Sequence, residues 1–147
     1  MMRLSTKGRY GSRVMLHLAL HYGKGPVLLK DIARQEEISE GYLEHLLPPL
    51  KAAGLINSTR GAHGGYMLSK APSEVTLKEV VQSLEGSLSP VECVDTPSVC
   101  QRVHSCVTRD IWKKLGSKIS DTLEAITLKD MVEMQNSRGE NFLTYDI

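Results

Sequence analysis

The sequence predicts a mainly α-helical fold with one small β-hairpin, and three features of its 147 residues support this. Apolar side chains recur every three or four positions in the first fifty residues, which is the spacing of amphipathic helices. Two short runs of strand-forming residues then flank a glycine-rich turn, which is typical of a hairpin. A second apolar repeat begins at residue 107 and continues to residue 126, which predicts a long C-terminal helix.

The first fifty residues predict a helix-turn-helix. Residues 10–22 carry an apolar face and form the first helix, which the glycines and proline of residues 23–26 end. Residues 30–35 follow as a short amphipathic helix, and Ser39 is a good N-cap for a further helix that begins at Glu40. Two helices joined by a turn of a few residues are the helix-turn-helix layout.

The segment that follows predicts a broken helix and then a hairpin. Residues 48–49 are both proline, so we expect a kink or restart there, with Gly54 as a left-handed cap after the final turn. Residues 55–60 and 66–69 are the two strand candidates, and the turn Gly61–Gly65 joins them. A hairpin directly after a helix-turn-helix is the wing of a winged helix.

The second half predicts a connecting helix, a loop and a long helix. Thr76–Glu79 has the spacing of a capping box for the connecting helix. The loop 87–106 contains two prolines and all three cysteines, and a loop of this length in a small protein is usually functional or disordered. After the long helix of residues 107–126, Thr127–Asp130 can cap a last short helix, whose tail we expect to fray after Asn136.

These elements divide the chain into three regions, 1–72, 73–106 and 107–147. The first is the winged helix-turn-helix, the second holds the connecting helix and the cysteine loop, and the third holds the long helix and the C-terminal tail. Lys and Arg outnumber Asp and Glu by ten to five in residues 1–72 but are outnumbered twelve to eight in residues 73–147. A polyanion such as double-stranded DNA would therefore bind the first region.

Several other classes of protein are not expected. No paired carboxylates, Ser/His/Asp set or cofactor fingerprint indicates catalysis. No apolar run approaches the roughly 18 residues of a membrane span. The basic N-terminus lacks the apolar core and cleavage site of a secretory signal. We therefore expect a cytoplasmic protein that is not an enzyme and has no membrane partner.

A helix-turn-helix reads DNA by placing the start of its second helix in the major groove. Glu44 can accept a hydrogen bond from cytosine, and His45 can donate to an acceptor on a purine. Arg60, at the hairpin turn, can reach the minor groove or its phosphates, while basic residues of the first helix, including Arg13, can hold phosphates. The predicted DNA-contacting residues are Lys7, Arg9, Glu40, Gly41, Tyr42, Glu44, His45, Arg60, Gly61 and His63.

The cysteines predict a metal site or a reactive thiol. Cys93, Cys100 and Cys106 have the spacing Cys-x6-Cys-x5-Cys, and no other cysteine is present. An odd number in a cytosolic chain does not indicate a disulfide framework. Three thiolates suit an iron–sulfur cluster or zinc if a fourth ligand completes the set. The Cys-x2-Cys pairs typical of zinc knuckles are absent.

The long helix after the cysteine loop predicts a homodimer. Its apolar stripe is wide enough to pack against the chain's own core and to offer a seam to a partner. A second copy is the expected partner because a two-fold dimer would match a two-fold DNA site.

Five segments resemble the Rrf2 family of regulators, whose members include IscR, NsrR and CymR types. The similar segments are Arg3–Tyr10, Ile38–Glu44, Gly54–Ile56, Arg60–Tyr66 and Cys106–Trp112, and the resemblance covers almost the whole chain.

This resemblance implies a winged-helix homodimer in which the three cysteines hold an iron–sulfur cluster, with [2Fe–2S] expected ahead of [4Fe–4S]. Glu44, His45 and Arg60 match residues that read DNA in IscR-like members. Glu44 is similar to the glutamate whose placement changes with cluster state and so alters the choice of operator.

The sequence departs from the family pattern at two positions. IscR-like members have a histidine three residues after the last cysteine, where this chain has Arg109, and NsrR-like members can use an acidic residue where this chain has Gly8. The fourth ligand is therefore unassigned, with His104, Glu92, Asp95 or a small exogenous molecule as candidates. The resemblance implies that CymR-like members lack the cysteines, so all three cysteines here favour a cluster.

Three hypotheses follow. The first is a regulator of iron–sulfur assembly, sulfur or nitrosative-stress genes that senses its surroundings through a cluster. The second is a regulator of the same fold without a cluster, whose thiols respond to redox state or to cysteine metabolism. The third is a small metalloenzyme or an iron–sulfur carrier; no catalytic set supports the enzyme, and a carrier would have no need of a wing.

Overall fold

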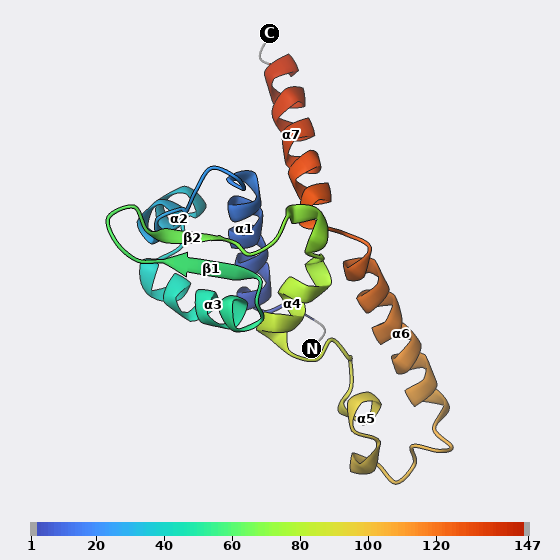
Figure 1. The fold of residues 1–147 in the computed structure, drawn as a ribbon. Coiled ribbons are helices and arrows are strands. Elements are labelled where there is room, and N and C mark those ends of the chain that lie inside the picture. Colours follow the sequence, from blue (N-terminus) through green and yellow to red (C-terminus); the bar gives the residue numbers. More distant parts are fainter. Residues whose placement is uncertain (1–2, 146–147) are drawn as a thin grey trace.

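The N-terminal half is built around one helix, α1 (Thr6–Leu20), in the computed structural model, which describes residues 3–145 and side chains up to residue 139 (Figure 1). The helices α2 (Leu29–Glu36) and α3 (Glu40–Ala52) pack against α1, and the strands β1 (Ile56–Thr59) and β2 (Gly65–Leu68) follow α3. The core side chains between these elements include Val14, Met15, Leu18, Ile32, Leu43, Leu46, Leu50 and Ile56. This arrangement confirms the predicted mainly helical fold with a winged helix-turn-helix.

The first helix begins one turn earlier than predicted. The apolar pattern predicts a start at Tyr10, whereas α1 begins at Thr6. The Glu85 carboxylate, far along the chain, accepts hydrogen bonds from the backbone N–H groups of Ser5 (3.0 Å) and Gly8 (3.1 Å). These N–H groups have no partner within a helix, so the carboxylate stabilises the extra turn. No local sequence pattern reveals this contact.

The third helix is uninterrupted, so the restart predicted at residues 48–49 is wrong. Proline has no N–H and leaves the carbonyl four residues earlier without a partner. Those carbonyls belong to Glu44 and His45, which lie on an exposed face where water can bond to them. Buried leucines on both sides of the prolines hold the two halves of α3 against the core. They are Leu43, Leu46, Leu47 and Leu50.

Side-chain caps confirm the predicted starts of two helices. The Ser39 hydroxyl accepts a hydrogen bond from the Tyr42 N–H at 3.1 Å at the start of α3. The Thr76 hydroxyl accepts one from the Glu79 N–H at 3.2 Å at the start of the connecting helix. Such caps satisfy N–H groups that the first turn leaves free.

The predicted hairpin is present and is anchored to the chain ahead of α2. The strands are antiparallel, with Ile56 opposite Leu68. Val27, in the segment before α2, bridges Tyr66 through two backbone hydrogen bonds of 2.8 Å. Gly65 has a φ of 146°, and a Cβ there would lie 2.3 Å from the Val27 carbonyl oxygen. The bridge therefore requires glycine at this position.

The second half is more extended (Figure 1). Its elements are a 3-10 turn η1 (Pro72–Glu74), α4 (Leu77–Glu85), α5 (Glu92–Asp95), a 3-10 turn η2 (Pro97–Val99), α6 (Val107–Glu124) and α7 (Leu128–Tyr145). The segment predicted as a loop, 87–106, thus contains two short helical turns. Within residues 3–145, no helix is both long and apolar enough to cross a membrane.

The last helix is long, whereas the sequence predicts a short helix with a frayed tail. Its predicted cap is confirmed, because the Thr127 N–H donates to the Asp130 carboxylate at 2.9 Å and the Asp130 N–H donates to the Thr127 hydroxyl at 3.1 Å. Leu128 is fully buried, and Met131 and Val132 pack against the core. The polar composition of the distal segment conceals this helix from a periodicity analysis.

The helices α1 and α4 pack closely because two glycines of α1 face α4. A Cβ at Gly11 would lie 2.0 Å from Leu84 Cδ1, and a Cβ at Gly8 would lie 2.6 Å from Glu85 Oε1. The space beside Gly11 is too small for a methyl group while Leu84 keeps its position, whereas a side chain at Gly8 would displace the Glu85 carboxylate that caps α1.

We expect Gly11→Ala to lower the free energy of unfolding by about 1–3 kcal/mol, because the added methyl overpacks the contact with Leu84. Urea unfolding monitored by circular dichroism measures the change. Gly41→Ala is the matched control, since a Cβ there meets nothing within 4 Å and alanine favours a helix. Equal stability of the two variants would contradict the close-packing argument.

Candidate DNA-binding surface and cysteine loop

The start of α3 presents an exposed polar face. Glu40, Gly41, Glu44 and His45 are all exposed, as the helix-turn-helix interpretation predicts. Tyr42 is half-buried, and its ring packs edge-to-face against the ring of Tyr10 with centroids 5.8 Å apart. Tyr42 therefore also anchors α3 to α1.

The basic residues of the first helix fall into two groups. Lys7 and Arg9 are exposed and make no ion pair within the described part of the chain. Arg13 donates to the backbone carbonyl of Glu36, and its Nε lies 3.4 Å from the Glu36 carboxylate. Arg13 thus already links α1 to α2, whereas Lys7 and Arg9 can bind a phosphate.

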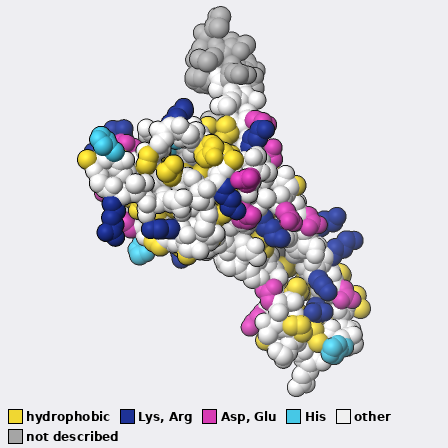
Figure 2. All heavy atoms as spheres, viewed as in Figure 1, with side chains coloured by type: hydrophobic (Ala, Val, Ile, Leu, Met, Phe, Trp, Pro, Cys, Tyr) yellow, Lys and Arg dark blue, Asp and Glu magenta, His cyan; other side chains and the backbone are white. Residues whose placement is uncertain are grey.

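The hairpin turn carries exposed residues on a defined backbone. Arg60, Gly61 and His63 are exposed, and the Gly64 N–H donates to the Gly61 carbonyl at 3.0 Å. Lys51 of α3 donates to the Ser58 hydroxyl of β1 at 2.7 Å. Figure 2 shows Lys, Arg and His side chains at the end of the molecule formed by the hairpin, α2 and α3. The second helix of the helix-turn-helix and the hairpin thus form one polar surface.

The three cysteines lie in one segment but on different short elements. Cys93 is in α5, Cys100 follows η2, and Cys106 is the residue before α6. All three are free thiols of intermediate burial. The Arg109 side chain donates from Nε to the Cys93 backbone carbonyl at 3.2 Å and so joins α6 to α5. Sequence reasoning treats Arg109 only as a poor ligand and misses this structural role.

Hydrogen bonds favour the thiolate form of Cys106. The Thr108 hydroxyl lies 3.2 Å from Cys106 Sγ. This hydroxyl, with help from the backbone N–H of Arg109, holds the pKa of the Cys106 thiol below its ordinary value. Cys106 is therefore the thiol that the surroundings prepare for metal binding or for reaction.

The thiols of the cysteine loop are suitable donors for an iron–sulfur cluster, but they are not arranged around a common point. Three free thiols in one short segment are the donors that such clusters require. Among the described residues, however, no three His, Cys, Asp or Glu side chains are arranged to hold a metal ion. Cluster binding would therefore need the segment to draw its thiols together.

The candidates for a fourth ligand differ in availability. The Ser87 and Ser89 hydroxyls donate to the Asp95 carboxylate and hold its pKa below the ordinary value, so Asp95 is already engaged. Glu92 and His104 are exposed. Gly8 lies in α1, where the Glu85 carboxylate fills the space beside it.

The long helix after the cysteines keeps an apolar face exposed. No side chain of α6 is fully buried. Four large apolar side chains along it expose between 36% and 72% of their surface, and they are Val107, Ile111, Trp112 and Ile119. An exposed apolar stripe of this size is typical of a protein interface.

Comparisons with known proteins match nearly the whole chain. The Rrf2 family, described as an iron-dependent transcriptional regulator, matches residues 4–134. The transcriptional regulator CymR of Bacillus subtilis is 38% identical over 144 residues, which cover 98% of this chain and 99% of CymR. The solved structure of CymR, described as the global cysteine regulator of B. subtilis, has a TM-score of 0.77 at 39% identity and covers 91% of this chain and 98% of that one.

Regulators of the IscR type are similar to about the same degree. IscR of Photorhabdus laumondii is 40% identical over 134 residues, which cover 91% of this chain and 81% of IscR. The structure of IscR from T. potens has a TM-score of 0.74 at 40% identity and covers 90% of this chain and 88% of that one. The likeness therefore extends equally to two types of regulator.

We expect Cys106 to be alkylated faster than Cys93 and Cys100 in reduced, metal-free protein near neutral pH, because a lowered pKa leaves more thiolate. Mass spectrometry after iodoacetamide pulses over a range of pH gives the rate at each thiol. Thr108→Val should slow the reaction at Cys106 by removing the hydroxyl, whereas Ser105→Ala should not. Equal rates at all three thiols would show that Thr108 has no such effect.

Proposed function

Because the chain belongs to the Rrf2 family of transcriptional regulators, we propose that it is a DNA-bound sensor whose cysteine loop holds an iron–sulfur cluster. Family membership makes it a DNA-binding winged helix-turn-helix regulator and not an enzyme. We further propose which residues contact DNA, that the protein forms a homodimer, and that it binds a cluster. A DNA-bound role would place the protein in the cytoplasm with the chromosome.

The exposed start of α3 beside the hairpin turn is the observation that carries the DNA-reading proposal. Glu44 and His45 face outward and can contact base edges in the major groove, with Glu40 and Gly41 beside them. Arg60 and His63 would reach the neighbouring minor groove or its phosphates, where the turn at Gly61 lets the backbone approach. Lys7 and Arg9 would contact phosphates. Tyr42 would act by positioning α3.

We expect Arg60→Ala to weaken DNA binding and to reduce the log–log slope of affinity against salt concentration by about 1, because one phosphate-neutralising cation is lost. Fluorescence anisotropy with an operator selected from genomic fragments, at several salt concentrations, measures both quantities. Lys129→Ala removes the same charge from an exposed position on α7 and should leave both the DNA affinity and the salt slope unchanged. An Arg60→Ala affinity equal to that of the control would remove the hairpin from the DNA-binding surface.

The apolar face of α6 supports a homodimer. Val107, Ile111, Trp112 and Ile119 expose apolar area that pairing with a second copy would bury. A two-fold dimer would also place two α3 helices on one face of a DNA duplex.

We expect the protein to sediment as a dimer and Ile111→Glu to sediment as a monomer, because a buried unpaired carboxylate opposes association. Analytical ultracentrifugation measures the mass. Ser117→Glu adds the same charge to an exposed position elsewhere on α6 and should leave the dimer intact. A dimer that tolerates Ile111→Glu would mean that this face is not the interface.

The cysteine loop supports the sensor proposal. We propose Cys93, Cys100 and Cys106 as the cluster ligands, with [2Fe–2S] ahead of [4Fe–4S] and the fourth position taken by Glu92, His104 or a small molecule. When bound, the cluster would supply a centre that responds to iron, sulfur, redox state or nitric oxide.

Connectivity favours communication between this loop and the DNA-binding surface. The loop begins directly after Glu85, whose carboxylate caps α1, and its end is tied to α5 by Arg109. Drawing the thiols together would move the start of the loop, which lies next to Glu85. A change at Glu85 would be transmitted to the first turn of α1, which carries Lys7 and Arg9.

A second candidate is a cluster-free thiol regulator, and one observation favours it. The lowered pKa of Cys106 would make this thiol reactive without any metal. CymR of B. subtilis, which is as similar as IscR, is described as a cysteine regulator. In this version, oxidation of Cys106 or its bonding to another thiol would replace the cluster as the signal.

Purification without oxygen separates the two candidates. The cluster proposal predicts a coloured protein with about two iron and two sulfide per chain, and loss of both in Cys100→Ser but not in Ser98→Ala. The thiol candidate predicts a colourless protein whose DNA affinity falls on oxidation and recovers with a reductant. Iron and acid-labile sulfide analysis, with DNA binding on the same samples, distinguishes these outcomes.

A further inference from the structure

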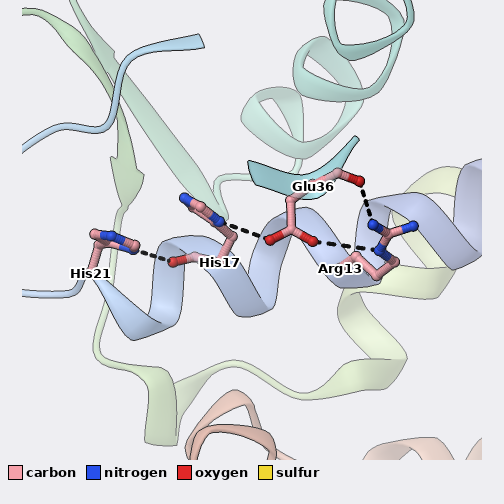
Figure 3. Close-up of polar contacts among 4 residues, drawn as sticks. All are labelled: Arg13, His17, His21 and Glu36. Atoms are coloured by element: carbon pink, nitrogen blue, oxygen red, sulfur yellow. Dashed lines mark hydrogen bonds and ion pairs between the residues drawn. The ribbon is translucent and has the colours of Figure 1, made fainter. Parts of the chain in front are cut away.

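A buried histidine on α1 belongs to a polar network that neither the DNA surface nor the cysteine loop uses (Figure 3). His17 exposes only 4% of its surface, on the face of α1 that is otherwise apolar. Its Nδ1 lies 2.9 Å from the Glu36 carboxylate of α2. Arg13 holds the other carboxylate oxygen of Glu36 at 3.4 Å. The network therefore fixes the orientation of the imidazole ring.

This orientation leaves one ring nitrogen of His17 without a partner. A carboxylate only accepts hydrogen bonds, so Nδ1 carries a proton and donates to Glu36. In the neutral ring Nε2 then has a free lone pair. Nε2 is buried and has no hydrogen-bond partner among the described residues, which is uncommon and costs stability. A buried nitrogen with a free lone pair can bind a ligand that accepts this lone pair.

His21, the residue directly after α1, is oriented by a similar hydrogen bond. Its Nδ1 donates to the His17 backbone carbonyl at 2.8 Å, so its Nε2 is also free of the proton in the neutral ring. The two rings are stacked, with centroids 4.6 Å apart and planes within 16° of each other. Figure 3 shows the free nitrogens of His17 and His21 on the same side.

Both histidines line one cavity of about 440 Å³ between α1, α2 and the hairpin turn. Asp31 of α2 and His63 of the hairpin turn line it too. These side chains add a carboxylate and a third imidazole to the rim. The cavity is remote in sequence from the cysteines, and no cysteine lines it.

We propose that this cavity binds a divalent first-row transition metal through Nε2 of His17 and His21. His17 and His21 are four residues apart at the end of α1, and their rings stack side by side. Parallel rings cannot both direct a lone pair at one metal ion, so the half-buried His21 ring rotates to complete a bidentate site. The Glu36 carboxylate supplies the outer-shell hydrogen bond that metal-bound histidines almost always make. Asp31, His63 or water completes the coordination. Since no three-ligand group is preformed among the described residues, His21 and the rim close on the metal as it binds.

The role of this site goes beyond the proposed cluster sensing. A metal that recruits His63 would tie the hairpin turn to α1 and α2 and restrict its position. Metal binding and DNA binding would then be linked, since the same turn carries Arg60.

Nickel binding by a chain without cysteines tests the proposal. The full-length protein, free of any histidine tag and carrying Cys93→Ser, Cys100→Ser and Cys106→Ser, is titrated with NiCl₂ by calorimetry. We expect one Ni²⁺ per chain. His21→Ala should reduce the affinity at least tenfold, and Glu36→Gln should reduce it by about 10- to 100-fold.

The controls separate this site from surface histidines and from misfolding. His45→Ala removes an exposed imidazole far from the cavity lining and should leave the nickel affinity unchanged. Circular dichroism melting of each variant reports whether it folds, and half-buried His21 keeps the test valid if changes at His17 disrupt the core. In the folded parent, Zn²⁺ should shift the NMR signals of the His17 and His21 rings. Substoichiometric binding by the parent, or equal loss in His21→Ala and His45→Ala, would overturn the proposal.

Discussion

The contact between α1 and α4 is the constraint on which the rest of the molecule depends. Gly8 and Gly11 remove the side chains that would separate the two helices, so Leu84 and Glu85 reach the surface of α1. The Glu85 carboxylate then meets the positive end of the α1 dipole and the free N–H groups of its first turn. Because α2, α3, β2 and α7 all pack on α1, one carboxylate helps to orient both α3 and the C-terminal region.

Arg109 departs from the family pattern and has a structural role of its own. At the position where the family resemblance leads us to expect a histidine, this chain has a permanent cation that cannot bind a metal. Its guanidinium instead donates to the Cys93 carbonyl and fixes one end of the cysteine loop against α6. Cys106 lies three residues away, beside Thr108, and keeps a thiol that favours the ionised form. The loop is thus held at one end while its centre stays open to rearrangement.

Local patterns predict much of the fold, because caps and hairpins are determined by neighbouring residues. The Ser39 cap, the hairpin and the exposed start of α3 all follow from the sequence. The features that the sequence does not predict have a different cause. The early start of α1 depends on Glu85, and the uninterrupted α3 depends on core packing on both sides of its prolines. The cavity beside His17 was equally hidden, although histidines four residues apart on an apolar helix face were a visible signal. Long-range contacts create these features, and a local pattern does not contain them.

The bridge between Val27 and Tyr66 has a consequence for how such regulators diversify. It joins β2 to the chain ahead of α2 at Tyr66, near the turn end of the strands, so both strands are held to the body of the protein. We therefore expect exchanges at the exposed residues Arg60, Ala62 and His63 to alter this surface without disturbing the fold, whereas the positive φ of Gly61 favours glycine there. Substitution of Gly65 would break the bridge. The exposed turn positions can thus vary only while the bridge is preserved.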